Sequence, residues 1–121
     1  MNEDEVLAFV HTEIGSVWAV ELLIFLETHS HQGWNSEDLV LALRSSSMAV
    51  AQAINRLHAA GFIREQTPGT FRFEPRSSAH LEIAQAIATL SAQKPMRLAK
   101  AIAEIPNEKL RNFSDAFKFR E

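Results

Sequence analysis

The chain has 121 residues, 46% of them hydrophobic, and a formal net charge of −3. This size and composition suit one domain with a core of its own and argue against global disorder. The absence of cysteine excludes disulfides, thiolate catalysis and cysteine-based zinc sites. The segment Met1–Glu5 is acidic where a secretory signal is basic, and the longest apolar run, Val17–Leu26, is too short to span a bilayer. We therefore expect a soluble, cytoplasmic, single-domain protein.

The charged residues divide the chain into three parts. Residues 1–43 contain eight acidic residues and no Lys or Arg, whereas residues 44–76 contain five Arg and two Glu, a local balance of +3. Residues 77–121 contain seven basic and five acidic residues. A net-acidic chain is a poor general binder of polyanions, but a basic segment on one face can still bind nucleic acid. A chance fluctuation among solvated side chains is the alternative interpretation.

The N-terminal part is expected to form two helices. The first covers Asp4–Thr12, and Ser16 is the expected N-cap of the second, which runs from Val17 to about Thr28. The second helix is apolar almost all round, so it must be covered on most sides. We expect this cover to come from the N- and C-terminal helices or from a second subunit. Residues 29–33 are expected to form a loop.

A short strand and a short helix follow this loop. Trp34 is expected to start the strand, and Ser36 to cap a helix that ends at Leu43. Glu37 and Asp38 fall in the first turn of this helix, where the helix dipole favours acidic residues. For Trp34, a place in the core is favoured over a binding role.

A polar turn then leads to a longer helix. This helix begins at Ser46 or Ser47 and ends at Ala60, followed by Gly61 in the left-handed position that ends many helices. Its inward residues have the i, i+4, i+7 spacing of one helix face: Val50, Ile54 and Leu57.

A β-hairpin is expected next, with strands at about 62–66 and 70–74. Alternation along the second strand places Phe71 and Arg72 on opposite faces. Pro68-Gly69 suits the centre of a type II turn, which matches the twist of the strands poorly in a two-residue loop. We therefore expect a slightly longer, open loop at the tip.

Three helices are expected after Pro75. Ser78 caps the first, which runs from Ala79 to about Ala92, and Pro95 opens a second that runs through Ile105. The last has an amphipathic pattern formed by Leu110, Phe113, Ala116 and Phe117.

The helix Ser47–Ala60 is the candidate recognition helix for DNA. The outward positions at its start and along its length are Ser46, Ser47, Ala49, Gln52, Asn55 and Arg56. Gln and Asn side chains can pair bidentately with adenine, and Arg with guanine. Ser hydroxyls and backbone N–H groups at a helix N-terminus can bind phosphate. An ordinary solvated helix face is the alternative.

The hairpin supplies further candidates. Arg64 and Arg72 lie on its two strands and Thr70 begins the second strand, where contacts to the DNA backbone or minor groove are expected. The alternative for both arginines is an exposed cross-strand charge, paired with Glu65 or Glu74.

Two more arginines flank this unit. Arg44 and Arg76 are candidate phosphate contacts. The alternatives are a charge at a helix C-terminus for Arg44 and a solvated loop residue for Arg76.

Neither a metal site nor a catalytic set is visible in the sequence. His29 and His31 would offer two imidazoles in one loop, but Glu27 is the only nearby acid, so a solvated loop is favoured over metal binding. The other histidines form no set of nucleophile, base and orienting group, and the four glycines punctuate helices and turns. We expect no enzymatic activity and no cofactor.

Within Ser46–Ile63, the pattern consists of Val50, then Ile54-Asn55-Arg56-Leu57, then Ala60-Gly61-Phe62-Ile63. It resembles the winged helix-turn-helix regulators of the MarR, ArsR and PadR type, over roughly residues 16–75. The resemblance implies a mainly α fold with a small β-hairpin wing, with residues 1–15 and 76–121 as flanking helices. It further implies homodimerisation through terminal helices and repressor-like binding to a two-fold DNA site.

Two functions follow as hypotheses. The favoured one is a homodimeric transcriptional regulator that inserts the helix 47–60 into the major groove of double-stranded DNA, with the hairpin 62–74 as wing. Base readers would be Gln52, Asn55 and Arg56. Backbone contacts would come from Arg44, Arg64 and Arg72. The alternative is a winged-helix adaptor for protein partners, which would use the acidic residues 1–43 or a docking helix at Phe113–Phe119.

Overall fold

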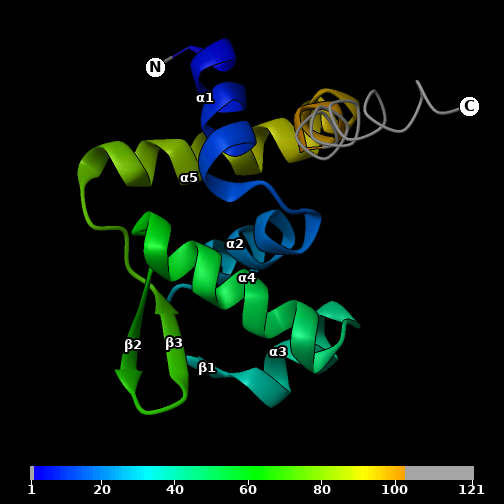
Figure 1. Ribbon diagram of the computed structural model, residues 1–121. Helices are drawn as coiled ribbons and strands as arrows, with labels where there is room; N and C mark the ends of the chain where they lie inside the picture. Colours follow the sequence, from blue (N-terminus) through cyan, green and yellow to red (C-terminus); the bar gives the residue numbers. More distant parts are fainter. Residues whose placement is uncertain (1, 103–121) are drawn as a thin grey trace, which may run out of the picture.

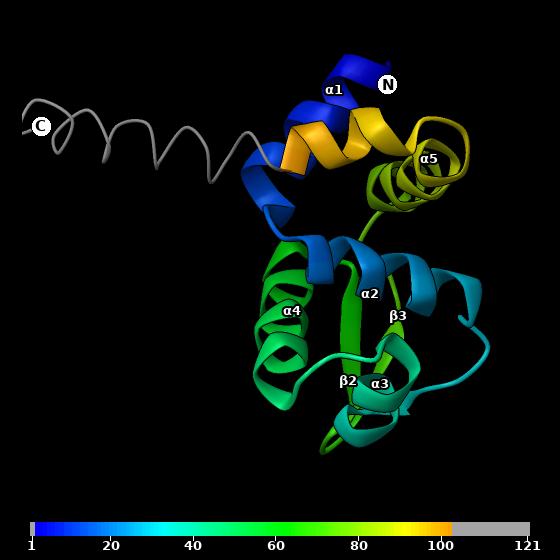
Figure 2. The same ribbon diagram turned by 90° about the vertical axis from the view of Figure 1, so that its right-hand side faces the viewer.

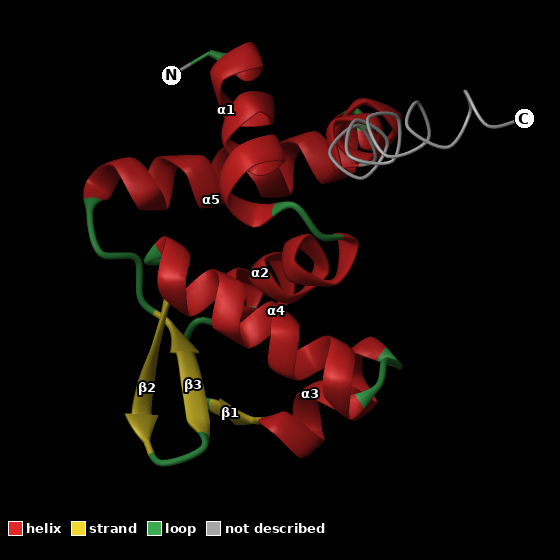
Figure 3. Ribbon diagram, viewed as in Figure 1, coloured by secondary structure: helices red, strands yellow, loops and turns green. Residues whose placement is uncertain are grey.

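Two tiers of helices and one small sheet make up residues 2–102, the part of the chain that the computed structural model describes (Figures 1 and 2). The helices are α1 (Glu3–Phe9), the π-helix η1 (Val10–Ile14), α2 (Val17–Thr28), α3 (Ser36–Leu43), α4 (Ser47–Ala60) and α5 (Ser78–Gln93). The strands are β1 (Trp34–Asn35), β2 (Ile63–Thr67) and β3 (Thr70–Phe73). Helices dominate, as Figure 3 shows, and residues 95–102 are also helical. The predicted helix end at Ile105 and the predicted last helix around Phe113 lie outside the described residues.

The apolar helix α2 lies between the two tiers. It contacts α5 and η1 of the upper tier, and α3, α4 and β3 of the lower tier (Figure 2). Leu22, Leu23 and Leu26 are fully buried, and each contributes roughly 1.5–3 kcal/mol by leaving water. Much of the cover that this helix needs therefore comes from the chain itself. Val17 and Trp18, at its first turn, remain 56% and 37% exposed.

Side-chain caps set the starts of the helices. Ser16 caps α2 as predicted, and its Oγ accepts a hydrogen bond from the amide three residues later. However, α3 is capped by Asn35 rather than Ser36, and α5 by Ser77 rather than Ser78. Both predicted caps are one residue too late, because the preceding residue has the extended backbone and its side chain reaches the amide three positions on.

The first helix is longer than predicted and changes from an α-helix to a π-helix along its length. It starts at Glu3 as α1 and continues as a π-helix to Ile14, rather than ending at Thr12. Gly15 ends it in the left-handed conformation, with φ 59°, and its amide donates a 2.8 Å hydrogen bond to the Val10 carbonyl. This bond spans five residues, so the turn is wider than the α-helical period used in the prediction.

The sheet is antiparallel, and β3 is its central strand in the order β1-β3-β2. Phe71 is paired with Trp34 on β1, and Phe73 with Ile63 on β2. Phe73 and Ile63 are buried, so this face of the sheet closes the lower end of the core.

The hairpin tip is tighter than predicted. Thr67 pairs with Thr70, so Pro68 and Gly69 form a two-residue turn in which Gly69 has φ 85°. A register shift between Glu65 and Thr67 marks a bulge, and such a bulge adds the local twist that a tight turn of this kind otherwise lacks. Glu65 also accepts a 2.7 Å hydrogen bond from the Gly69 amide. The prediction of an open loop was wrong because it did not include the bulge.

Ion pairs tie the start of α1 to the segment after α5. Glu3 accepts a hydrogen bond from Lys94 Nζ at 2.9 Å and pairs with Arg97 Nε at 2.8 Å, while Asp4 lies 3.1 Å from Arg97 Nη2. The hydrogen bond from Lys94 is the main cause that lowers the pKa of Glu3. Partial burial opposes this change, and the charges of Arg97 and Lys94 add to it.

No single helix within residues 2–102 is long and apolar enough to cross a membrane. Glu3–Ile14 and Val17–Thr28 reach that length only together, across a bend of 112°.

We expect Glu3→Gln to destabilise the protein at neutral pH and to lose this effect in acid. Because the pKa of Glu3 is lower in the folded chain than in the unfolded chain, its contribution is present above the unfolded pKa. The contribution is lost as the pH falls through the folded pKa. Urea unfolding of both proteins, at neutral pH and below the titration range of carboxylates, measures the difference. Glu21→Gln, at an exposed residue of α2, is the control. A Glu3→Gln effect of equal size at both pH values would contradict the assignment.

Substitution of two glycines by alanine distinguishes the cost of backbone strain from the cost of a steric clash. Gly61 has φ 89° and the Arg76 guanidinium lies where a Cβ would be, whereas Gly69 has φ 85° and open space around it. Gly69→Ala should lower the free energy of unfolding by about 1–2 kcal/mol through left-handed strain alone. Gly61→Ala should cost roughly 1 kcal/mol more, because Arg76 must give up its hydrogen bond to the Ala59 carbonyl. Chemical denaturation measures both changes, and equal losses would contradict this explanation.

Candidate nucleic-acid interface

Helix α4 is fixed through its buried face, which leaves its polar residues outside. Its inward residues pack against α2 and α3 and are all buried: Val50, Ala53, Ile54 and Leu57. Ser46 is the N-cap, and its Oγ accepts a 3.1 Å hydrogen bond from the Ala49 amide. The predicted start, inward face and glycine end of this helix are confirmed.

Most of the predicted outward residues are exposed. They are Ser46, Ser47, Gln52, Asn55 and Arg56, while Ala49 is half-buried. Gln52 and Asn55 lie three residues apart, so their amide groups share one side of the helix. These residues therefore form a polar face on α4. Arg56 differs from the others because its side chain bonds another part of the chain.

The Arg56 side chain bonds back to the N-terminal helices. Its Nη1 donates a 3.2 Å hydrogen bond to the Ile14 carbonyl, at the end of η1. Carbonyls in the last turn of a helix lack intrahelical partners, and the helix dipole attracts a cation there. The contact ties α4 to η1 and takes one of the donors that the guanidinium would offer to a base.

Arg44 holds a strained backbone position between α3 and α4. It is the only non-glycine residue in the described range with a positive φ, 54°, a conformation that costs roughly 1–2 kcal/mol. Its amide bonds the Leu41 carbonyl at 3.3 Å, and the Ser45 amide bonds the Val40 carbonyl at 3.1 Å, which ends α3. Its exposed guanidinium makes no hydrogen bond or ion pair with any residue of 2–102. Within the described part of the chain, nothing occupies this guanidinium, which lies just before the start of α4.

Arg64 and Arg72 are cross-strand neighbours on the face of the hairpin opposite Phe73. Arg64 Nη1 pairs with Glu74 Oε2 at 3.1 Å, which is one of the cross-strand alternatives considered from the sequence. Arg72 Nε instead donates a 2.9 Å hydrogen bond to the Ser30 carbonyl, in the loop after α2. Both arginines therefore share a face and have partners within the chain. Thr70 is half-buried beside the turn.

A carbonyl partner does not neutralise an arginine. Three arginines bond backbone carbonyls and keep their full charge: Arg56 on Ile14, Arg72 on Ser30 and Arg76 on Ala59. Of the five arginines in residues 44–76, Arg64 alone is paired with an acid that lies within residues 2–102. The positive balance of this segment therefore survives folding, although its side chains are less free.

The histidine loop differs from the prediction. His29 is part of an aromatic cluster rather than solvated, with ring centroids 4.3 Å from Phe25 and 5.6 Å from Trp34. Its Nδ1 lies 2.8 Å from the Phe25 carbonyl, while His31 stays exposed. Contact with these rings shields His29 partly from water, a contact that the loop sequence did not indicate. Within residues 2–102, no group of three or more His, Asp or Glu is placed to hold a metal ion.

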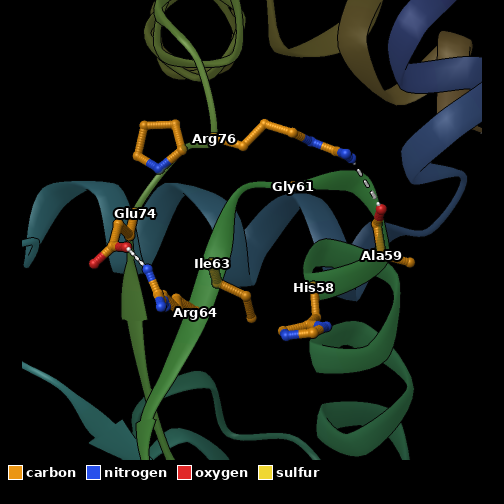
Figure 4. Close-up of a pocket in the computed structure, with 8 residues that line it drawn as sticks. His58, Ala59, Gly61, Ile63, Arg64, Glu74 and Arg76 are labelled. Carbon is orange, nitrogen blue, oxygen red and sulfur yellow. Dashed lines mark hydrogen bonds and ion pairs between the residues drawn. The ribbon is translucent and has the colours of Figure 1, made fainter.

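An open hollow of about 490 Å³ lies where α4 ends and the hairpin begins (Figure 4). It is lined by His58, Ala59, Gly61, Ile63, Arg64, Glu74, Pro75 and Arg76. It lies at the opposite end of α4 from Ser46 and Ser47. Sequence reasoning did not single it out, because two segments separated by the hairpin form it together.

The partners of the arginines were also missed, apart from Glu74. Glu74 can be predicted as a partner of Arg64, because it lies two positions after Arg72, the residue that strand pairing places opposite Arg64. Backbone carbonyls occur at every residue, so nothing in the sequence marks those of Ile14, Ser30 and Ala59 as acceptors.

Comparison of the chain with protein-family models, with curated proteins and with solved structures gives no match.

We expect Arg56→Ala to lower the free energy of unfolding by about 1–2 kcal/mol, because the Ile14 carbonyl loses its charged donor. Gln52→Ala, one turn earlier on the exposed side of α4, should change stability by less than about 0.5 kcal/mol. Urea unfolding distinguishes the two substitutions. If both leave stability unchanged, Arg56 is free in solution and returns to the set of candidate base readers.

Proposed function

We propose that the protein is a DNA-binding transcriptional regulator of the winged helix-turn-helix type, with α4 as recognition helix and the β2–β3 hairpin as wing. The observation that carries this proposal is the arrangement of elements after α2. A short strand, two helices joined by a tight turn, and a hairpin follow in that order, and the short strand pairs with the second strand of the hairpin. This arrangement supports the type that the sequence resembles.

The exposed amides of α4 are the proposed base readers. Gln52 and Asn55 are solvent-exposed on one side of the helix, and both residue types pair bidentately with adenine in the major groove. Arg56 is proposed as a positioning residue, because its bond to Ile14 holds α4 against η1. From the sequence, Arg56 was expected to read bases together with Gln52 and Asn55. Its hydrogen bond to the Ile14 carbonyl is the reason for proposing a positioning role instead.

We propose that contacts to the DNA backbone come from the start of α4 and from the hairpin. Arg44 and the amides around Ser47 lie at the start of α4, where the helix dipole favours a phosphate. Arg72 keeps its charge on the wing, with Thr70 near the tip. Arg64 contributes less, because Glu74 already compensates its charge.

We expect the regulator to act in the cytoplasm as a homodimer on a two-fold site, with the N-terminal helix and the segment after Ala79 at the interface. The exposure of Val17 and Trp18, next to the N-terminal helices, supports a surface that a second copy covers. Sedimentation equilibrium measures the oligomeric state, and a monomer at all concentrations would contradict this part of the proposal.

An adaptor that binds another protein is the second candidate. The observation that favours it is the pair Leu41 on α3 and Met48 on α4, which are 77% and 72% exposed. Exposed Leu and Met side chains suit a protein interface, although apolar groups can also contact thymine methyls. The acidic residues of 1–43 would then attract a basic partner.

Selection from a random pool of double-stranded DNA tests the first candidate against the second. We expect enrichment of a two-fold motif, and an affinity for the selected duplex that falls steeply with salt as phosphates are contacted. Asn55→Ala and Gln52→Ala should each weaken specific binding by about 1–3 kcal/mol. Gln32→Ala, at an exposed glutamine of the loop after α2, outside the proposed readers and the proposed dimer interface, is the matched control and should leave the affinity unchanged. Absence of enrichment, with weak binding to any sequence at low salt, would favour the adaptor.

A further inference from the structure

The hollow at the end of α4 has basic side chains on three sides (Figure 4). Arg76 runs along its upper edge, Arg64 stands on the hairpin side, and His58 extends from α4 on the other side. The hollow is open to solvent, and the charged groups rather than an apolar cavity dominate its lining. Such a lining suits a small anion better than an apolar ligand.

Hydrogen bonds of its backbone and its side chain hold Arg76 at this edge. Its amide donates a 2.8 Å hydrogen bond to the Gly61 carbonyl, and its Nη2 donates a 3.2 Å hydrogen bond to the Ala59 carbonyl. The guanidinium passes over Gly61, where any Cβ would collide with it. A guanidinium has five N–H donors, and the Ala59 carbonyl takes one of them. No other donor of this guanidinium has a partner within residues 2–102.

Arg64 is held by a contact that an anion can replace. Its ion pair with Glu74 is solvent-exposed, with 73% of the Arg64 and 47% of the Glu74 side chain accessible. Exposed ion pairs are weak, because water screens the charges and both side chains lose freedom. A doubly charged oxyanion can therefore compete with the single carboxylate of Glu74 for this guanidinium.

We infer that the hollow binds the phosphate group of a small phosphorylated molecule, held by Arg64 and Arg76. Guanidinium groups match phosphate oxygens in bidentate geometry, and two guanidinium charges balance a phosphate dianion. The site goes beyond the proposed function, because it lies at the opposite end of α4 from Ser47 and neither Gln52 nor Asn55 lines it. A ligand here bridges the last turn of α4 and the base of the hairpin, so it stabilises the junction of these two elements.

Titration of sodium pyrophosphate into the full chain at constant ionic strength, followed by ¹⁵N NMR, tests the site. We expect saturable shifts of the amides of residues 59–64 and of Glu74 and Arg76. Arg64→Gln should weaken binding about 10-fold or more, because the charged donors of one guanidinium are lost. Glu74→Gln should tighten binding, because the competing carboxylate is removed. Lys100→Gln removes the same charge at an exposed position of the helical segment 95–102 and should change affinity less than about 2-fold.

Three outcomes would overturn the site: shifts that do not saturate, equal effects of Arg64→Gln and Lys100→Gln, or weaker binding by Glu74→Gln. A second titration, with a duplex oligonucleotide in place, identifies the source of the phosphate. Simultaneous binding supports a small phosphorylated ligand, whereas displacement of pyrophosphate by DNA would overturn it in favour of backbone phosphate. Loss of DNA binding leaves the pyrophosphate titration readable, so failure of this site and failure of the proposed function are distinguishable.

Discussion

Burial of α2 is the constraint on which the rest of the structure depends. A helix that is apolar almost all round has no side to present to water, so elements must be placed above and below it. The upper cover comes from η1 and α5, and the lower cover from α3, α4 and β3. Elements of both tiers therefore contribute to the burial of this one helix (Figure 2). Because α4 contributes to this cover with one face, its other face is left polar and exposed at a fixed orientation.

Arginine side chains join the elements that this packing brings together. Arg56 connects α4 to the end of η1, Arg72 connects β3 to the loop after α2, and Arg76 connects the chain after the hairpin to the last turn of α4. All three bond carbonyl groups outside regular strands or at helix ends, where backbone acceptors lack a partner. These contacts give basic residues a structural role without removing their charge. The same residues can thus fix the geometry of a surface and keep it attractive to an anion.

The junction at Gly61 links two features that the sequence presents separately. The glycine ends α4 in a left-handed conformation, and its missing side chain makes room for the guanidinium of Arg76. The end of the helix, the base of the hairpin and the cationic edge of the hollow therefore depend on one position. The hollow lies at the last turn of α4, and neither Gln52 nor Asn55 lines it, although Asn55 is only three residues before His58.

The sequence by itself determined the helices α2 and α4, the existence of the hairpin and the exposed face with Gln52 and Asn55. Apolar spacing, capping residues and turn residues are local signals, so they can be recognised without knowledge of any long-range contact. Only the tertiary structure decided that η1 is a π-helix, that His29 joins the Phe25 and Trp34 rings, and that Arg56 bonds Ile14. These features depend on which backbone carbonyls and rings come close in space. Every residue has a carbonyl, so no pattern in the sequence distinguishes those that meet an arginine.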